Sequence, residues 1–434
     1  MTNIAQDLVE AAVNRLPVDA LTPVRKAALA RFAQSGFPSV KHEDWKYTNL
    51  GPAIELSNTW LANSAAVAPR TTWTADAKQA VDEILEGIDA SWIIFANGNV
   101  ALETLAKAES LESQGIHMSK LSNGRSNAAI ISDDPMTSFN AALLQDGLHV
   151  GIRPSAYQVK PLGFLFVDNS LSGSLSQARI VIDVENEADI DIIEAHVSVG
   201  SDAQFANLVI QLSIEKGARV AYVRIQDRAD THMQVGSLIA RLHQDSVLDY
   251  ASFDFGGSMV RNDVAVDITQ PGAIGKLHGL YLAGTNQHID NHSRVDHHVG
   301  PAVSRAEYRG ILNGRAHCVF NGKAVVHKGA DGTDAEQSNH NLLLSKTAEI
   351  DTKPELEIYA DDVKCAHGAT VGQLDKSALF YLRTRGIDQD EATQLLTRAF
   401  AGRILTAAPI EATHAYIVQK TDRRLDELTT GDSP

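Results

Sequence analysis

Hydrophobic residues follow two different periods along the chain. Near the N-terminus Val24, Ala28 and Phe32 recur at helical spacing, and a similar apolar stripe is present near the C-terminus. In the middle of the chain, short apolar runs such as residues 91–95 and 179–184 have the length and composition of β-strands. Most of these runs are not separated by a long amphipathic segment, so a doubly wound α/β sheet is not expected.

A weak repeat runs through the strand-rich part. Four segments place a polar residue or glycine, and then a small residue, before a strand; they begin at Glu187, Gly217, Asp245 and Gly272, which are 30, 28 and 27 residues apart. This spacing fits one coil of a stacked β-solenoid, in which the small residue lets the chain turn a corner. The pattern is degenerate, and a β-sandwich remains an alternative on this evidence alone.

The chain returns to helical patterns after residue 372. Asp375 can cap a helix that ends at Gly386, Asp388 can cap a second one, and a last helix is expected over residues 411–428. A solenoid exposes unpaired strand edges at its ends, so these helices could close it, and their exposed faces could dock a partner.

Together the patterns predict a mainly β protein with a parallel β-helix core between helical segments. We expect a helical N-terminal segment and linker over residues 1–90, the β-helix over 91–372 and a helical C-terminal domain over 373–434.

Composition restricts the class of protein. The chain of 434 residues is long enough for two or three units, and its formal charge of −16 argues against a nucleic-acid or anionic-membrane surface. Two cysteines cannot form a disulfide framework, no apolar run approaches the length of a membrane helix, and no secretory signal pattern begins the sequence. We therefore expect a cytoplasmic protein without nucleic-acid or membrane partners.

Histidines concentrate in one part of the chain, which suggests a metal site. Ten of the 16 histidines lie between His232 and His340. The densest group, next to the carboxylates Asp290 and Asp296, is His288, His292, His297 and His298. One hypothesis is a metal-dependent β-fold enzyme that uses the 288–298 cluster. The alternative is structural hydrogen bonding, because the spacings match none of the helix-borne zinc patterns.

A second candidate lies directly after a short alternating strand. Here one of the two cysteines precedes a histidine by two residues, in Asp362-Val363-Lys364-Cys365-Ala366-His367-Gly368-Ala369-Thr370. In an extended chain Cys365 and His367 share one face and could hold a soft metal or sulfur. Packing in an apolar interior is the alternative, because two ligands do not make a site.

Motifs for nucleotide chemistry are absent from the sequence. It has no G-x-x-x-x-G-K-[ST] loop, no G-x-S-x-G elbow and no G-x-G-x-x-G fingerprint. We therefore expect no ATP hydrolysis by this chain, and a scaffold or assembly subunit is favoured over an enzyme.

A resemblance to a known family rests on segments 309–312, 321–323, 331–332, 339–344, 349–372 and 380–387, with 36–38 and 43–48 near the N-terminus. On these residues the chain resembles the SufB/SufD family of SUF iron–sulfur cluster assembly scaffolds, and within it the SufD branch rather than the SufB branch. The resemblance covers nearly the whole chain and is strongest over residues 305–405.

The resemblance implies a helical N-terminal part, a parallel β-helix and helical C-terminal part. It also implies a complex with a SufB-like paralogue and a SufC-like ABC-type ATPase, with a transient iron–sulfur cluster between this chain and the paralogue.

The resemblance also implies which residues take part. His367 would be the cluster ligand on this side, with Cys365 as a neighbour. The isolated chain would bind no cofactor stably and could form a homodimer. The ATPase would dock on the helices over residues 375–408, through Leu379, Phe380, Leu395, Leu396 and Phe400.

The chain departs from the family pattern at one place. Many relatives carry a cysteine between the Asp-His pair and the following serine, where this chain has Asp296-His297 and then Pro301-Ala302-Val303-Ser304. No second sulfur ligand is therefore available near residue 302. Cys318 lies where the family pattern has no cysteine, and we assign it to packing.

Overall fold

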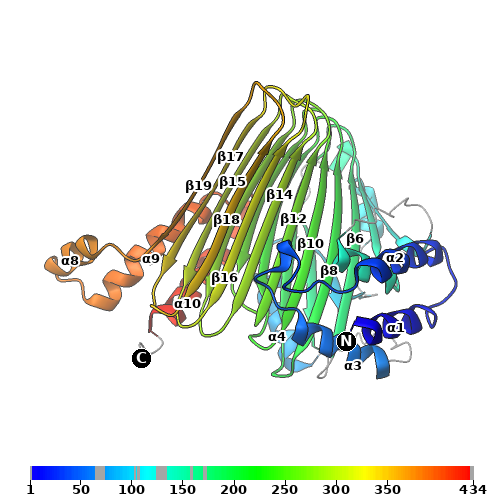
Figure 1. The fold of residues 1–434 in the computed structure, drawn as a ribbon, viewed down its shortest axis with the longest axis horizontal. Helices are drawn as coiled ribbons and strands as arrows, with labels where there is room; N and C mark the ends of the chain where they lie inside the picture. Colours follow the sequence, from blue (N-terminus) through cyan, green and yellow to red (C-terminus); the bar gives the residue numbers. More distant parts are fainter. Residues whose placement is uncertain are drawn as a thin grey trace.

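The strands of the protein form two long sheets that face each other (Figure 1). The computed structural model describes residues 2–63, 74–101, 104, 108–123, 134–156, 160–169 and 174–430. From β5 onwards consecutive strands alternate between the two sheets, so that each pair of strands makes one coil of a flattened solenoid.

Within the described ranges, sheet A holds ten strands and sheet B holds nine. The order in sheet A is β19 (Lys364–Gly372), β17 (Asp334–Leu343), β15 (Val303–Leu312), β13 (Ile274–Ala283), β11 (Val247–Asp254), β9 (Arg219–Asp227), β7 (Asp189–Ser198), β5 (Leu162–Asp168), β1 (Ser91–Ala96) and β2 (Asn99–Val100). The order in sheet B is β18 (Glu349–Ile358), β16 (His317–Val326), β14 (His288–His297), β12 (Met259–Ile268), β10 (Met233–Leu242), β8 (Gln204–Ile214), β6 (Ser174–Val184), β4 (Leu148–Ile152) and β3 (Ile116–Lys120).

Strand direction decides between the two folds that the sequence left open. The pairs β1–β2 and β3–β4, at the start of the sheets, are antiparallel, and every later pair in the described residues is parallel, for example β10 with β12. A β-sandwich is built from antiparallel strands. The predicted parallel β-helix is therefore confirmed, and the sandwich alternative is wrong.

The corner segments recognised in the sequence contain the residues that turn the chain. Their first residues all have positive φ, namely Glu187 (61°), Gly217 (69°), Asp245 (56°) and Gly272 (80°). The small residues that follow are fully buried: Ala188, Ala218, Ser246 and Ala273. A Cβ atom on Gly217 would come within 2.3 Å of the exposed Glu187 carboxylate of the previous coil, which would have to move aside, and glycine adopts the positive φ of this position without strain.

The space between the sheets, which we call the lumen, is filled by every second side chain of each strand. Ile192, Ile210 and Tyr222 represent this set, and each is at most 1% exposed. The outer faces of the sheets carry separate apolar clusters, which the helices cover. Burial of both faces of parallel strands explains why the sequence shows continuous apolar runs there.

Helices cover the outer faces of both sheets (Figure 1). Those on sheet B come mainly from the N-terminal part: α1 (Thr2–Val13), α2 (Thr22–Ser35), the 3₁₀ turn η1 (Glu43–Trp45), α3 (Gly51–Asn63) and α7 (Pro135–Ala142). The outer face of sheet A is covered by α4 (Ala75–Gly87), α9 (Gln389–Leu405) and α10 (Glu411–Thr430). The remaining short helices are α6 (Ala108–Ser113), α8 (Lys376–Thr384), η2 (Leu121–Asn123) and η3 (Pro154–Ala156).

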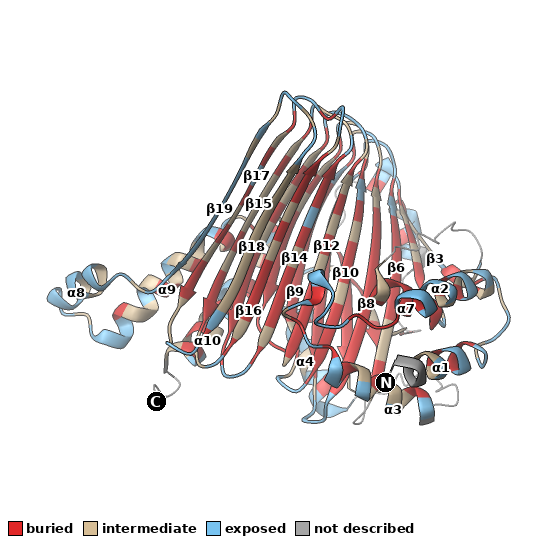
Figure 2. Ribbon diagram, viewed as in Figure 1, coloured by how far each residue is buried: buried red, intermediate tan, exposed pale blue. Residues whose placement is uncertain are grey.

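The C-terminal helices begin where the sequence predicts. Asp375 accepts a hydrogen bond from the Ser377 N–H and caps α8, and Asp388 accepts one from the Glu391 N–H and caps α9. However, the expectation that these helices close the solenoid is wrong. The apolar side of α9, which includes Ile404, is buried against the outer face of sheet A, because that face is itself apolar. The last strands, β18 and β19, are left uncovered, and α8 projects away from the coils (Figures 1 and 2).

The corner positions give a direct test of the fold. Replacing Ala218 by Leu should lower the free energy of unfolding by about 1–3 kcal/mol, because the fully buried corner has no room for three more carbon atoms. The matched control is Lys216→Leu, in the same turn but with an exposed side chain. Urea unfolding followed by circular dichroism measures both, and equal midpoints would contradict the corner assignment.

Candidate functional site

The predicted pair Cys365 and His367 lies on the last strand of sheet A. In the described residues β19 pairs only with β17, where Cys365 is in register with Ala335 and His367 with Gln337. Ala335 and Gln337 are buried and face the lumen, since Gln337 donates a hydrogen bond to the Glu355 carbonyl on the opposite sheet. The structure therefore places both Cys365 and His367 on the lumen side of the final coil.

None of the described residues forms a further coil on this side, so the end of the solenoid is a surface. His367 is exposed and Cys365 is half-buried. Every residue of β18 is partly or fully exposed, and Figure 2 shows β18 and β19 in the colours of intermediate and exposed residues. The adjoining apolar side chains are open to solvent, with Tyr359 62% exposed and Val371 49% exposed. We call this surface, made by β18, β19 and Tyr359, the open end.

The two side chains differ in their readiness to act as ligands. Partial burial, together with the nearby Asp334 carboxylate, raises the pKa of the Cys365 thiol, although the Ala335 N–H opposes this shift. At neutral pH the Cys365 thiol is therefore protonated and is a poor nucleophile until a metal or a cation comes close. One imidazole and one thiol are an incomplete set, because iron and zinc sites normally use four ligands.

The other cysteine, Cys318, is part of the core. Cys318 is fully buried in the lumen, and burial strongly raises the pKa of its thiol. Its assignment to packing is confirmed.

The histidine cluster of residues 288–298 does not form one site. These residues lie on and directly after β14, where alternate side chains point to opposite faces. His297 points into the lumen, where its Nε2 lies 2.9 Å from the Ser304 hydroxyl. His288, Asp290 and His292 point outwards on the other face. The hypothesis of a single metal centre built from this cluster is therefore wrong.

The outward group instead fastens the N-terminal segment to sheet B. The Arg261 guanidinium lies 3.8 Å from the centre of the Trp45 ring and donates to the Asp290 carboxylate at 2.8 Å. Thr48 contacts both the Asp290 carboxylate and the His288 ring. The His292 ring, 2.9 Å from the Asp290 carboxylate, and the Arg261 guanidinium hold the pKa of Asp290 well below its usual range despite complete burial. These are structural contacts between β12, β14 and the N-terminal segment.

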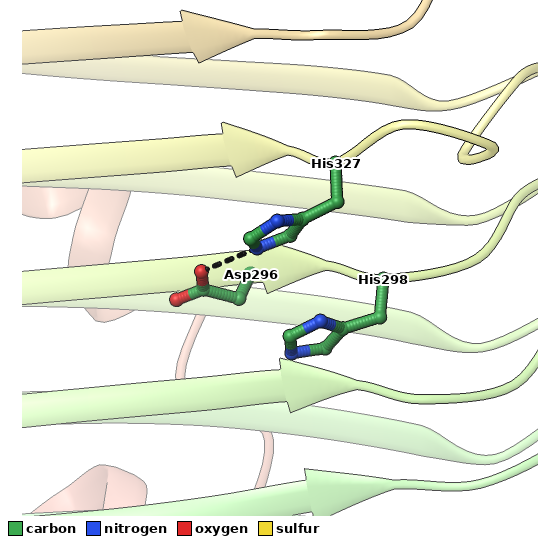
Figure 3. A group of neighbouring side chains, drawn as sticks. All are labelled: Asp296, His298 and His327. Atoms are coloured by element: carbon green, nitrogen blue, oxygen red, sulfur yellow. Dashed lines mark hydrogen bonds and ion pairs between the residues drawn. The ribbon is translucent and has the colours of Figure 1, made fainter.

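One convergence of ligand atoms was missed in the sequence. Asp296 and His298 meet His327, which lies one coil further along, and all three ligand atoms lie within 4.8 Å of one another (Figure 3). The signal in the sequence was the spacing of 29 residues between the two histidines, which equals one coil of the solenoid.

The predicted docking residues on the C-terminal helices differ in exposure. Phe380 on α8 is 69% exposed and Leu395 on α9 is 42% exposed, whereas Leu379 and Leu396 are half-buried. Phe400 packs towards sheet A, with the Arg309 guanidinium 4.9 Å from the centre of its ring. The sequence reading also missed an apolar residue, because Tyr381 on α8 is 57% exposed.

A membrane-spanning helix is not found in the described part of the chain, where every helix is too short or too polar.

Comparison with known proteins agrees with this architecture. The model of the SUF system FeS cluster assembly SufBD core domain matches residues 166–400, and that of the SufBD protein N-terminal region matches residues 7–161. The chain belongs to the SufBD family. The resemblance read from the sequence is thus confirmed.

Relatives within the SufBD family include SufD. The chain is 27% identical to the iron–sulfur cluster assembly protein SufD of Escherichia coli over 409 residues, which cover 93% of each protein. It is 25% identical to a SufBD family protein of Synechocystis over 91% of this chain and 89% of that protein. A SufBD family protein of Mycobacterium leprae is 33% identical over 50% of this chain and 57% of its own length.

One of the lumen histidines, His297, gives a pH test for this SufBD family member. Burial lowers the pKa of His297 to about 4, below the ordinary value of about 6.5. The unfolded chain therefore binds a proton that the folded chain excludes, and stability falls as the pH drops from about 6.5 to about 4. His297→Gln should reduce the slope of the unfolding free energy in this range by about 1.4 kcal/mol per pH unit.

Urea unfolding at a series of pH values measures this slope. Ser304→Ala is the matched control, because it removes the hydrogen bond to His297 but keeps the titrating ring. A His297→Gln protein with an unchanged slope would show that His297 does not titrate in this way.

Proposed function

We propose that this chain is a non-ATPase scaffold subunit of a SUF-type iron–sulfur cluster assembly complex, and that its open end is the interface with a SufB-like partner. A single observation carries the proposal: the last coil, with His367 on its lumen side, is not covered by any described element. Family membership supports the general role, and the geometry of β18 and β19 supports the specific surface.

Uncovered parallel strands are unusual in a stable protein. The outer edge of β19 carries backbone N–H and C=O groups with no neighbouring strand, and such edges tend to pair with another chain. Several apolar side chains surround this edge, among them Ile358, Tyr359 and Val371. A paralogue with coils of the same shape would cover both sheets at once and bury these side chains.

The proposed cluster would be cargo that the two subunits hold between them. His367 would supply an imidazole ligand from the last coil, and the partner would supply the thiolates that this chain lacks. Cys365, whose thiol is protonated at neutral pH, would become a ligand only after a metal arrives to displace the proton. Stacking of the partner would also exclude water from the site.

The ATPase would dock on the C-terminal helices. The sequence has no phosphate-binding loop, so ATP-driven work has to come from another subunit. The apolar residues Phe380 and Tyr381 are exposed on α8, which projects from the coils, and Leu395 is exposed on α9. Because α9 packs on β13 and β15, movement of the helices would be transmitted to the sheet that ends in β19.

Replacing His367 by Ala should reduce cluster formation by at least about tenfold, as expected for the loss of a ligand, and leave the complex intact. The assay is anaerobic reconstitution of the co-expressed complex, followed by its visible absorption. His340→Ala is the matched control, since His340 lies on neighbouring β17 but faces outwards, against Thr370. Full cluster formation by the His367 variant would remove this residue from the site.

Replacing Phe380 by Asp should weaken co-purification of the ATPase, because it places a charge in the proposed apolar contact. Phe400 is unsuitable for this test, since its ring packs against the solenoid. Val18→Asp is the control, because Val18 is 92% exposed but lies in the N-terminal part. ATPase binding that is equal in the two variants would place the docking surface elsewhere.

A further inference from the structure

Residues at the rim of sheet B form columns that run from coil to coil. The column directly after the strands contains Thr269, His298 and His327, since each of their N–H groups donates to the coil before. A second column, two residues earlier, contains Asp267 and Asp296, which are in register on β12 and β14. The rim thus places two histidines beside two aspartates on successive coils.

The two Asp–His pairs have the same arrangement, one coil apart. The His298 Nε2 atom lies 3.2 Å from the Asp267 carboxylate, and the His327 Nε2 atom lies 2.8 Å from the Asp296 carboxylate. The two imidazole rings stack nearly parallel, with their centres 4.5 Å apart. Figure 3 shows both rings and the Asp296 carboxylate projecting to the same side of the rim.

From this arrangement we propose that Asp296, His298 and His327 form a binding site for a divalent transition-metal ion. None of these three ligands belongs to the open end, although Tyr359 follows His327 in the same rim column, and the site does not depend on the proposed function. Two imidazoles and one carboxylate are the ligand set of many non-haem Fe²⁺ sites, and the same ligands suit Zn²⁺ and Co²⁺. Asp267 is near enough to His298 to serve as a fourth ligand or to orient the ring.

The distances allow such an ion after small side-chain rotations. Ligand atoms around a tetrahedral ion lie about 3.4 Å apart when the metal–nitrogen bonds are about 2.0–2.1 Å. The ligand atoms here lie within 4.8 Å, so they have to approach by about 1.4 Å. Both rings can turn, because the His298 and His327 side chains are 43% and 37% exposed.

Arg294 is the main competitor for the carboxylate. It donates to both oxygens of Asp296, at 2.5 Å and 3.0 Å. However, the Arg294 side chain is 53% exposed and can move into solvent, whereas the Asp296 carboxylate is only 9% exposed and stays in place. A bound ion could also keep Arg294 as a partner of one oxygen while it uses the other, as is common around metal-bound carboxylates.

The test is titration of the purified, metal-free chain with Co²⁺ alone, followed by calorimetry and by the visible ligand-field absorption of the ion. We expect one Co²⁺ per chain at this site, and at least about tenfold weaker binding in each of His298→Ala and His327→Ala. His317→Ala is the matched control, because His317 also lies on the outer face and is paired with a carboxylate, Asp351, at 2.8 Å. The His317 variant should bind Co²⁺ like the unchanged protein.

Absence of Co²⁺ binding by the unchanged chain would overturn the proposal, and so would binding that neither His298→Ala nor His327→Ala weakens. Thermal unfolding provides a second measurement, since a bound ion should raise the Tm of the unchanged chain but not of the double variant. His367→Ala should keep its Co²⁺ affinity here, which separates this site from the open end. A loss of binding in His367→Ala would assign the ion to the open end and overturn the rim site.

Discussion

The stacking of each coil in register on the next is the constraint on which the rest of the structure depends. From β4 onwards, parallel backbone hydrogen bonds join each strand to its equivalent one coil away, and residues separated by 26 to 32 positions become direct neighbours. Asp267 therefore lies beside Asp296, and Gln337 lies beside His367. The rim histidines and aspartates form columns of this kind, across the coils and not along the chain.

Register also explains how the lumen tolerates charge. Glu194, Arg224 and Asp254 are almost completely buried there, on three successive coils of sheet A. The Arg224 guanidinium lies 3.6 Å from Glu194 and 2.9 Å from Asp254, so that positive and negative groups alternate. Burial of a single one of these groups without its partners would be strongly unfavourable. A shift in register between the coils would separate these three charged groups, so their burial disfavours alternative registers.

Features set by local residues could be predicted from the sequence. The left-handed positions at Glu187 and Gly217 and the caps at Asp375 and Asp388 depend only on nearby residues and on the conformations that those residues allow. The opposite directions of His297 and His298 could also have been inferred, because adjacent residues of a strand face opposite sides.

Features set by contacts between distant residues could not be predicted. The position of α9 depends on the apolar outer face of sheet A, formed by residues such as Leu280 and Ile311, and the sequence cannot assign that face before the register is known. For the same reason the sequence could not predict that Phe400 packs against the solenoid or that the last coil is left uncovered. His327 was missed because two strands, β15 and β16, and their turns separate it from His298, and only the coil period brings the two rings together.

The open end affects the local stability of the last strand, β19. An internal strand of a stacked array has a neighbouring strand on each side, whereas β19 has one in the described residues. Strand β19 should therefore open more often and exchange its amide hydrogens faster than the internal strands. A second protein that stacks on it supplies the missing neighbour. Ordering of β19 and binding of that second protein are then thermodynamically linked. Part of the free energy of association is used to order the residues of β19 that face the second protein.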